Sequence, residues 1–517
     1  MRNRSEIKLL GQALLVGLFT GIVVGIFRLG IERMTSFWLK LFQLAHANLY
    51  WLIVIVIGLC IVGIIAGYFV KQYSHVGGSG IPEVKLQLQG NLSLSWFPIL
   101  WRKLIGGILV ISTGLFLGPE GPSLQLGATI GQGVGETAKQ TKTNIRVLIA
   151  TGAASGLAAA FGAPLSGALF VLEEVFHNFS QRVWLNALAG AMIADFVVSN
   201  LFGQHATLAL TYNYSFPIPL YWHLLILGVL LGILGHLYKI GLFNCKKLYE
   251  KVRFLPKWLF GFIPLLLLIP IAYFLPLITG PGNRLILALP KLITKPGWSI
   301  IGLLLAFYVI RLIFSIISYD SGLPSGIFLP ILTMGALIGA VYGLFMVQLH
   351  LLPQKLVINL IIFAMAGYFA AIIRAPFTAV ILITEMVGSL LHLMPLAVVS
   401  FISLLVDELL GGLPIYDSLA QAMMDKQKTR RTATIGQRDQ LTIPIYEDSN
   451  LVDQKIAAIA WPKNTLVKVI HRGGRDVIPN GQTKIANGDN LVLELDAGER
   501  GQVYDKIKQL QAVEYDG

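Results

Sequence analysis

A single carboxylate, Glu120, stands between two Gly/Pro pairs in the stretch Gly118-Pro119-Glu120-Gly121-Pro122. The stretch follows a long apolar run, and Glu120 is the only charged residue between Lys103 and Glu136. Glycine lets the backbone approach a ligand closely, and proline suits a first helical turn because the N–H it lacks would be unpaired there. The segment therefore predicts a break at membrane depth and then a helix N-terminus, whose N–H groups favour an anion. Glu120 is either a structural cap or a carboxylate that competes with a bound anion.

Two further breaks combine glycine with proline and precede apolar helices. In Gly77–Glu83, the hydroxyl of Ser79 is placed either to donate to an anion or to act as an ordinary N-cap. Ser321–Pro330 precedes a helix rich in small residues, and the successive backbone N–H groups of Ile327 and Phe328 would be anion donors. The alternative for this third break is a tight turn between helices.

Five more polar side chains lie within or beside apolar segments. Glu173 and Glu174 end an apolar helix, where two carboxylates are costly unless they are bonded, functional or facing cytoplasmic water. Lys103 either supports an anion site electrostatically or extends to the lipid headgroups. Tyr416 follows the last apolar window, so it is either an interfacial belt residue or a hydroxyl directed at a buried anion. Glu385 is expected to cap a neighbouring helix or to meet a basic partner.

The breaks belong to an internal repeat. Gly118–Gly131 and Gly326–Gly339 share glycine, proline and a Gly-Ala-x-Ile-Gly run at equal spacing, at an offset of 208 residues (326 − 118). Ala158–Glu173 and Ala370–Glu385 share a second pattern at an offset of 212 (370 − 158). Chance similarity between apolar segments is the alternative, but matched Gly and Pro in the same order favour a duplication. Duplicated halves with broken helices predict a binding site between the repeats near the membrane midplane.

The composition is that of a polytopic membrane protein. Of the 517 residues, 55% are hydrophobic and 13% are charged, and the mean hydropathy is +0.70. Apolar windows recur between residues 9 and 410, and the first is followed by many more, so it is a span rather than a cleaved signal peptide. Gly and Pro interrupt several windows, which makes a count of spans unsafe. The two cysteines predict neither a disulfide framework nor a metal site.

The net charge of +13 lies in the membrane part, because residues from Thr432 onward carry 10 Lys+Arg and 12 Asp+Glu. Basic residues before the first span, at 246–257 and at 426–431 place these segments and both termini in the cytoplasm, whereas the loop 203–222 has no Lys or Arg and faces outward. The excess also creates a field that favours anions near the pathway. Basic residues confined to short loops argue against nucleic-acid binding.

The composition changes after Arg431. Leu466–Arg472, Asp476–Ile478 and Asn490–Leu495 are predicted strands, and Leu451–Ala460 is a predicted helix. We therefore predict a transmembrane domain at residues 1–425, a basic linker at 426–434 and a small cytoplasmic α+β domain at 435–517.

Taken together, the motifs resemble those of the CLC family of chloride channels and chloride/proton antiporters. GSGIPE at 78–83, GPEGP at 118–122, GIFLP at 326–330 and the tyrosine after the last span occur in the family's order. The likeness covers residues 10–420. It implies an all-α polytopic fold with two inverted repeats and broken, re-entrant helices. It also implies a homodimer with a separate anion pathway in each subunit.

The resemblance implies roles for individual residues. Ser79 and Tyr416 would supply hydroxyls, and Ile327 and Phe328 backbone N–H groups, to a central chloride. Glu120 would be the gate, filling an anion site when deprotonated and swinging out when protonated.

Three positions bear on this expectation. Glu174 falls where antiporters of the family keep an internal proton-transfer glutamate, which favours antiport, although some members exchange ions without this acid. Ser79 stands where chloride-selective members have serine. Pro119 departs from the family pattern, since a basic residue is frequent there, and the departure alters the electrostatics around Glu120.

The C-terminal residues resemble the RCK-C (TrkA-C) module of bacterial potassium-transport regulators. The likeness rests on the strand order and on Asn487-Gly488-Asp489 before the final strand. It implies a cytoplasmic regulatory or dimerising domain with an unidentified small ligand.

These observations predict a multi-pass cell-membrane protein that exchanges chloride for protons. The carboxylate and chloride share one site, and protonation weakens the carboxylate's hold on it. Because no covalent step is needed, we expect no enzymatic activity, no metal and no cofactor, with chloride bound as substrate. A passive chloride channel gated by voltage or pH is the alternative. An intramembrane enzyme acting on anionic lipid headgroups is remote, since no histidine neighbours GPEGP or GIFLP and His75 stands alone.

Overall fold

The computed structural model describes residues 2–177, 179–203, 207–208, 210, 214–253, 255–431, 438–445, 449–473, 475–496 and 500–511. Parts of the predicted outward loop 203–222 and of the predicted linker 426–434 lie outside these ranges. The chain forms two compact units, Met1–Val84 with Ser95–Ile415, and Lys85–Leu94 with Tyr416–Gly517. We describe each unit by itself.

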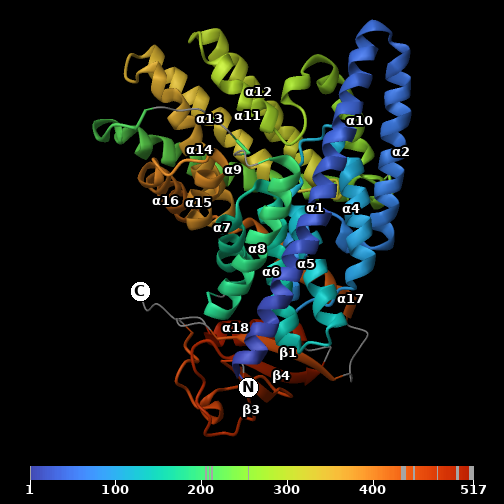
Figure 1. Ribbon diagram of the computed structural model, residues 1–517, viewed down its shortest axis with the longest axis vertical. Helices are drawn as coiled ribbons and strands as arrows, with labels where there is room; N and C mark the ends of the chain where they lie inside the picture. The colour runs from blue at the N-terminus through green and yellow to red at the C-terminus, as the bar shows by residue number, and fades with distance from the viewer. Residues whose placement is uncertain are drawn as a thin grey trace. The chain divides into compact units, whose positions relative to one another are not determined.

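Helices account for nearly all of the first unit (Figure 1). In chain order they are α1 (Arg2–Ala47), α2 (Tyr50–Gln72), α3 (Ile81–Leu88, which continues into the second unit), α4 (Trp96–Ser112), α5 (Glu120–Thr137), α6 (Lys142–Phe161), α7 (Pro164–Phe170), α8 (Gln181–Phe202), α9 (Trp222–Lys251), α10 (Phe262–Phe274), α11 (Asn283–Leu292), α12 (Trp298–Asp320), α13 (Phe328–Gln348), α14 (Val357–Ile373), α15 (Pro376–Val387) and α16 (Leu393–Leu409). Short turns lie between them, namely η1 (Ser74–Val76), η2 (Val171–Phe176, a π-helical turn), η3 (Ile218–Leu220), η4 (Lys257–Leu259), η5 (Pro276–Ile278) and η6 (Gln354–Leu356).

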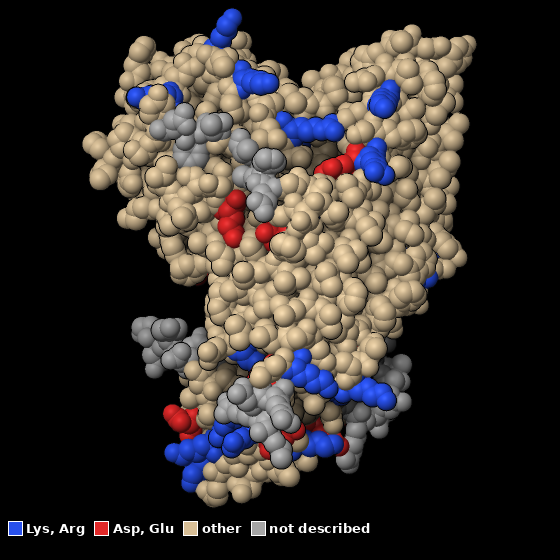
Figure 2. Space-filling view, in the orientation of Figure 1, with Lys and Arg blue, Asp and Glu red and all other residues tan. Residues whose placement is uncertain are grey.

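Two kinds of apolar helix build this unit. Among the described residues, nine helices are long and apolar enough to cross a membrane. The most apolar window of α2 is only 33% buried, with Ile53 and Ile57 more than half exposed, whereas the window at Gln354–Ile373, which contains α14, is 94% buried. A helix that is apolar all round needs either a lipid or a protein neighbour, so α2 faces lipid and α14 lies in the core. Figure 2 shows a mostly uncharged surface along the flank where Figure 1 labels α2.

The predicted repeat appears as two equivalent helix pairs, α5 with α6 and α13 with α14. A Cβ added to Gly127 would lie 1.9 Å from the carbonyl oxygen of Gly152, and one added to Gly335 would lie 2.6 Å from that of Ala364. The repeated glycines therefore sit at the same close backbone contact in both halves. Such small residues are what allow membrane helices to approach closely.

The second unit contains an antiparallel sheet of order β1-β4-β2-β3. Its elements are α17 (Ile415–Arg431, whose first residue belongs to the first unit), β1 (Arg438–Pro444), η7 (Ile456–Ala458), β2 (Leu466–Arg472), β3 (Arg475–Val477), β4 (Asn490–Asp496) and α18 (Arg500–Gln511). Leu441, Ile470, Leu493 and Ile507 are fully buried in its core. Apolar residues alternate along the strands, and the sheet face that they form packs against α18. This packing gives the predicted α+β architecture.

The predicted helix Leu451–Ala460 is wrong. Only the short turn η7 forms there, and Asp453 adopts a positive φ of 61°. The backbone N–H of Asp453 donates to the carbonyl of Ile485 at 2.8 Å, and that of Ile456 donates to the carbonyl of Thr483 at 3.0 Å. The segment satisfies its backbone by pairing with residues 481–485, and this long-range pairing replaces the helix that its apolar spacing suggested.

Candidate functional site

The three predicted breaks meet in the first unit. The N–H of Gly118 donates to the carbonyl of Gly326 at 2.7 Å, and the reverse bond is 2.8 Å. The N–H of Gly78 donates to the carbonyl of Leu323 at 3.1 Å, and the N–H of Ser325 donates to the carbonyl of Gly78 at 3.0 Å. Backbone hydrogen bonds therefore join segments far apart in the sequence into one junction, from which α3, α5 and α13 begin.

Ser79 is 1% exposed at this junction. Its hydroxyl oxygen accepts from the hydroxyl of Tyr319 at 3.3 Å and from the N–H of Ile81 at 3.4 Å. A hydroxyl has one hydrogen to donate as well as two lone pairs. Both bonds use the oxygen as acceptor, and no further bond of this hydroxyl is found in the described part of the chain. The Ser79 O–H can therefore donate to another group, as an anion site requires. The long bond to Ile81 makes Ser79 a weak cap of α3 at the same time.

Glu120 is the first residue of α5 and is 1% exposed. Its carboxylate lies against Gly118, where an added Cβ would be 2.1 Å from Oε2. The backbone N–H groups of Glu120 itself and of Leu329 stabilise the charged form of this carboxylate, while Oε2 has no hydrogen-bond partner among the described residues. A carboxylate oxygen buried without a donor is costly. The group is thus held by helix-end N–H groups and remains incompletely satisfied.

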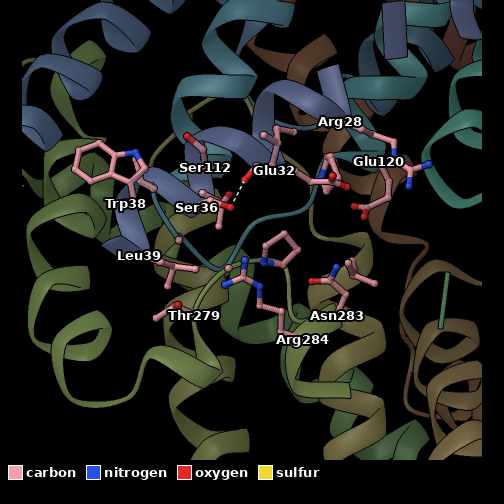
Figure 3. A pocket seen from close by; sticks show the side chains of 18 of the residues that line it. Arg28, Glu32, Ser36, Trp38, Leu39, Ser112, Glu120, Thr279, Asn283 and Arg284 are labelled. Atoms are coloured by element: carbon pink, nitrogen blue, oxygen red, sulfur yellow. Dashed lines mark hydrogen bonds between the residues drawn. The ribbon is translucent and has the colours of Figure 1, made fainter. Parts of the chain in front are cut away.

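A cavity of about 420 Å³ opens beside Glu120. In Figure 3, Arg28 lies next to Glu120 at one side of this cavity, and Arg284 and Asn283 line another side. Arg28 donates to the carbonyl of Ala159 at 2.9 Å and lies 4.2 Å from the ring centroid of Phe202. Anchored in this way, its guanidinium presents a fixed positive charge to the cavity. Other lining residues are Glu32, Ser36, Trp38, Ser112, Thr113, Pro119, Thr279 and Gly280.

Ile327 and Phe328 are fully buried at the start of α13. The first N–H groups of a helix have no partner within that helix, so the N–H groups of these two residues are available next to the junction at Gly326. The ring of Phe328 packs against Phe161 and Phe369, with centroids 5.1 and 4.5 Å away. This packing fixes the helix end that carries the two donors.

Lys103 does not extend to the membrane surface, since it is fully buried. Its Nζ donates to the carbonyl of Val76 at 2.9 Å and to that of Gly78 at 2.6 Å. The charge of Glu83 acts on the same ammonium. Lys103 therefore holds the break that carries Ser79 and adds a positive charge behind it.

Glu173 and Glu385 brace the two repeats reciprocally. Glu173 accepts two backbone N–H groups and the hydroxyl of Thr378 at the start of α15, at 2.6 to 3.2 Å. Glu385 accepts two backbone N–H groups and the hydroxyl of Ser166 at the start of α7. Each carboxylate thus caps the helix of the other half, which agrees with the capping role expected for Glu385.

Glu174 is 2% exposed and lies in the π-helical turn η2. Glu174 is therefore not surrounded by water, which argues against the alternative that it simply faces the cytoplasm. Single π-turns interrupting a helix occur frequently at functional sites. Tyr416 belongs to the second unit, where it is fully buried, and this burial argues against an interfacial belt position.

Sequence reasoning missed Tyr319 and Arg311. Tyr319 is the hydroxyl partner of Ser79. Arg311, 1% exposed, donates to the carbonyls of Ile278 at 2.6 Å and Pro281 at 2.7 Å, and so fixes a loop that lines the cavity. An arginine within the apolar window of α12 was a usable sign, because ionisable residues inside spans are rare and mostly functional. Within the described ranges, no group of three or more His, Cys, Asp or Glu could hold a metal ion.

The fold and the junction define a polytopic membrane protein with a buried carboxylate among helix ends and hydroxyls. Residues 62–408 match the family described as voltage gated chloride channel, and residues 441–508 match the TrkA-C domain. The chain belongs to the voltage gated chloride channel (CLC) family. Both resemblances inferred from the motifs are confirmed.

Individual relatives agree with this assignment. The H(+)/Cl(-) exchange transporter ClcA of Klebsiella pneumoniae subsp. pneumoniae is 30% identical over 451 residues, which cover 84% of this chain and 93% of the relative. The ClcA exchange transporter of Salmonella schwarzengrund is 30% identical over 450 residues, covering 84% and 92%. These relatives are named as transporters, in agreement with the expectation that the chain is not an enzyme.

Solved structures show the same fold. A slow cyanobacterial Cl-/H+ antiporter is 31% identical, with a TM-score of 0.75, over 81% of this chain and 98% of that one. A eukaryotic CLC transporter is 20% identical, with a TM-score of 0.67, over 81% and 74%. At this lower identity the second likeness concerns the fold alone.

Proposed function

We propose that the protein is a chloride/proton antiporter in which Glu120 and chloride compete for one site at the junction of the three breaks. The observation that carries the proposal is the buried Glu120 carboxylate, whose charged form is favoured by the backbone N–H of Leu329 at the start of α13 and whose Oε2 has no partner among the described residues. The naming of similar proteins as H(+)/Cl(-) exchange transporters supports the same reaction.

The proposed chloride site uses donors that are already in place. We assign the Ser79 O–H and the N–H groups of Ile327 and Phe328 as its ligands, with Lys103, bonded to the Gly78 carbonyl, supplying a positive charge through the break. By its place in the sequence, the Tyr416 hydroxyl is a further ligand. Hydrogen bonds to an anion are roughly twice as strong as neutral ones, so a few fixed donors compensate for lost hydration.

Exchange follows from the competition. The deprotonated Glu120 carboxylate occupies the helix-end donors and excludes chloride, whereas a protonated side chain has no charge and yields the site. Each change of occupant therefore requires a proton. Glu174, buried in η2, serves as the internal proton-transfer group between the cytoplasm and Glu120.

Glu120→Gln tests the proposal in proteoliposomes under an imposed chloride gradient. The glutamine keeps the shape of the side chain but cannot carry a proton, so we expect chloride to move without any proton uptake. Glu385→Gln is the matched control, because Glu385 is a half-buried glutamate that caps α7 and should leave the coupling unchanged. Proton uptake by Glu120→Gln equal to that of the unaltered protein would refute the assignment.

We also infer a homodimer in the cell membrane with both termini in the cytoplasm. The basic segments that flank the spans support this orientation. Light scattering of the purified protein tests the dimer. The orientation is tested by introducing cysteines at positions 5 and 510 and labelling them in intact cells. A monomer, or labelling from outside, would contradict these inferences.

The C-terminal unit is proposed to regulate transport by binding a small ligand, with residues 1–425 as the transport domain, 426–434 as linker and 435–517 as the regulatory domain. Arg472 donates to both carboxylate oxygens of Asp489 at 2.8 and 2.7 Å, which raises the pKa of its guanidinium and orders the turn before β4. A chain ending at Arg431 is expected to keep exchange but to lose any ligand dependence. Loss of exchange itself would contradict a purely regulatory role.

A further inference from the structure

The cavity in the first unit has two sides that differ in charge. On one side lies Arg28, and the charges of Glu120, Glu32 and Asp195 all act on its guanidinium. The charge of Arg28 is therefore balanced within the protein. On another side lies Arg284, for which no ion pair is found in the described part of the chain (Figure 3).

The helix that carries Arg284 begins at the cavity without a cap. α11 starts at Asn283, and both Asn283 and Arg284 line the cavity. No side chain caps the first turn of α11, and this turn contains no acidic residue. The partial positive charge of a helix start is normally matched by an acidic side chain, and a cation there is unfavourable. The start of α11 therefore favours an anion as its partner.

A further cation lies behind the loop that precedes α11. Arg311 is 1% exposed and donates to three carbonyls of this loop, at 2.6 Å (Ile278), 2.7 Å (Pro281) and 3.3 Å (Gly280). No carboxylate among the residues that the structure describes acts on this guanidinium. The loop thus directs carbonyl oxygens at Arg311, and an anion on the cavity side would offset the buried positive charge.

A hydrogen-bond donor without a partner lies in the same cavity wall. Trp38 of α1 is 4% exposed, and its indole Nε1 has no hydrogen-bond partner within the described ranges. The six-membered ring packs toward α2, since a Cβ added to Gly58 would lie 2.9 Å from Cη2. Figure 3 shows the nitrogen on the opposite side of the indole, toward the other lining residues. A buried N–H without an acceptor is costly, so this indole indicates an acceptor from outside the chain.

The size and lining of the cavity indicate an organic anion and not a bare halide. The volume of about 420 Å³ falls in the range of pockets for small organic ligands. Leu39 and Phe42 of α1 and Ala272 of α10 contribute apolar side chains to the lining. A guanidinium such as that of Arg284 matches the two oxygens of a carboxylate with two parallel hydrogen bonds.

We propose that this cavity binds a small organic carboxylate with an apolar body. The carboxylate accepts from Arg284, from the start of α11 and from the Nε1–H of Trp38, and the apolar body lies against Leu39 and Phe42. The site is separate from the junction at which Glu120 and chloride are proposed to compete, and binding to it does not require that competition.

The test is a titration of benzoate into the full chain in lipid nanodiscs, followed by ligand-observed NMR. Benzoate should bind saturably. Arg284→Gln should weaken its binding by about tenfold, because hydrogen bonds to a charged group are lost. Trp38→Phe keeps an aromatic ring but removes the N–H, so it should weaken binding by about threefold or more. Arg33→Gln is the matched control and should leave binding unchanged, because Arg33 is an exposed arginine of α1 that does not line the cavity.

Two further probes test the class of ligand. Benzamide has the shape of benzoate without its charge and should not displace it, whereas acetate lacks the ring and should bind several-fold more weakly. Absence of saturable benzoate binding, displacement by benzamide, or acetate binding as tight as that of benzoate would overturn the proposal.

The variants decide whether the binding belongs to this cavity. Unchanged benzoate affinity in Arg284→Gln or in Trp38→Phe would overturn the site, and so would an equal loss in Arg33→Gln, because surface charge in general would then explain the binding. None of these measurements involves chloride exchange, so a failure here is distinct from a failure of the proposed function.

Discussion

At the scale of single residues, the site depends on how charges are arranged around Glu120. The stretch GPEGP places no cation beside the carboxylate, because proline occupies position 119. The structure supplies one from α1 instead, since Arg28 lines the same cavity and its charge acts on Glu120. The charges of Glu32 and Asp195 act on Arg28 as well, so this arginine lies among three carboxylates.

Arg28→Gln is therefore predicted to change the pH dependence of transport. A nearby cation favours the charged form of a carboxylate. Without the Arg28 guanidinium, Glu120 should therefore bind a proton at a higher pH. We expect the pH profile of chloride flux in proteoliposomes to shift upward by about one pH unit. Arg28→Lys should shift it little, and adding Pro119→Arg to Arg28→Gln should bring it back.

Arg284→Gln is the control for this prediction. Arg284 lines the same cavity, but it is an exposed residue whose charge is screened by water. A shift of equal size in Arg284→Gln would mean that the overall charge of the cavity matters and not the specific partner of Glu120.

The residues proposed for the site can be selected from the sequence by type and order, whereas their hydrogen-bond partners cannot. Glycine, proline and a lone carboxylate pointed to Glu120, and the hydroxyl and helix-end donors pointed to Ser79, Ile327 and Phe328. That Lys103 bonds to Gly78, or that Tyr319 bonds to Ser79, depends on contacts between distant segments. Local patterns carry no information about such contacts, so these pairs needed the structure.

At the scale of secondary-structure elements, closely packed helices hold the junction in place. α5 begins at Glu120 and packs against α6, with Gly127 and Gly152 at the point of closest approach. A Cβ added to either glycine would lie 1.9 Å from the carbonyl oxygen of the other. The position of Glu120 thus depends on glycines far from the site.

Gly152→Ala is predicted to destabilise the protein by about 2 to 3 kcal/mol, or to prevent folding, because the added methyl group meets backbone that cannot rotate away. Thermal unfolding in detergent measures the effect. Gly11→Ala is the matched control, since nothing lies within 4 Å of the added Cβ in α1, and it should be neutral or slightly stabilising. Equal stability of the two variants would contradict the packing argument.

The repeat made the helix pairs predictable, because identical spacing of glycines in the two halves implies identical contacts. The cross-repeat caps of Glu173 and Glu385 follow the same symmetry. The C-terminal unit was harder to predict, because the apolar spacing of 451–460 fits a helix locally while hydrogen bonds to 481–485 decide the outcome.

At the scale of the whole molecule, duplication explains why one site forms. Two halves, each with helices interrupted by Gly and Pro, bring helix N-termini from different parts of the chain to one place. In the proposed mechanism, the protein contributes fixed donors and the Glu120 carboxylate, and a proton on Glu120 changes which occupant is favoured. The central claim is therefore that chloride and the Glu120 carboxylate exclude each other.

The most direct test measures chloride affinity by calorimetry at acidic and at alkaline pH, for the unaltered protein and for Glu120→Gln. Competition predicts that chloride binds more weakly to the unaltered protein at alkaline pH, where the carboxylate is charged, and equally at both pH values to Glu120→Gln. A chloride affinity of the unaltered protein that does not depend on pH, or the same dependence in Glu120→Gln, would contradict the account.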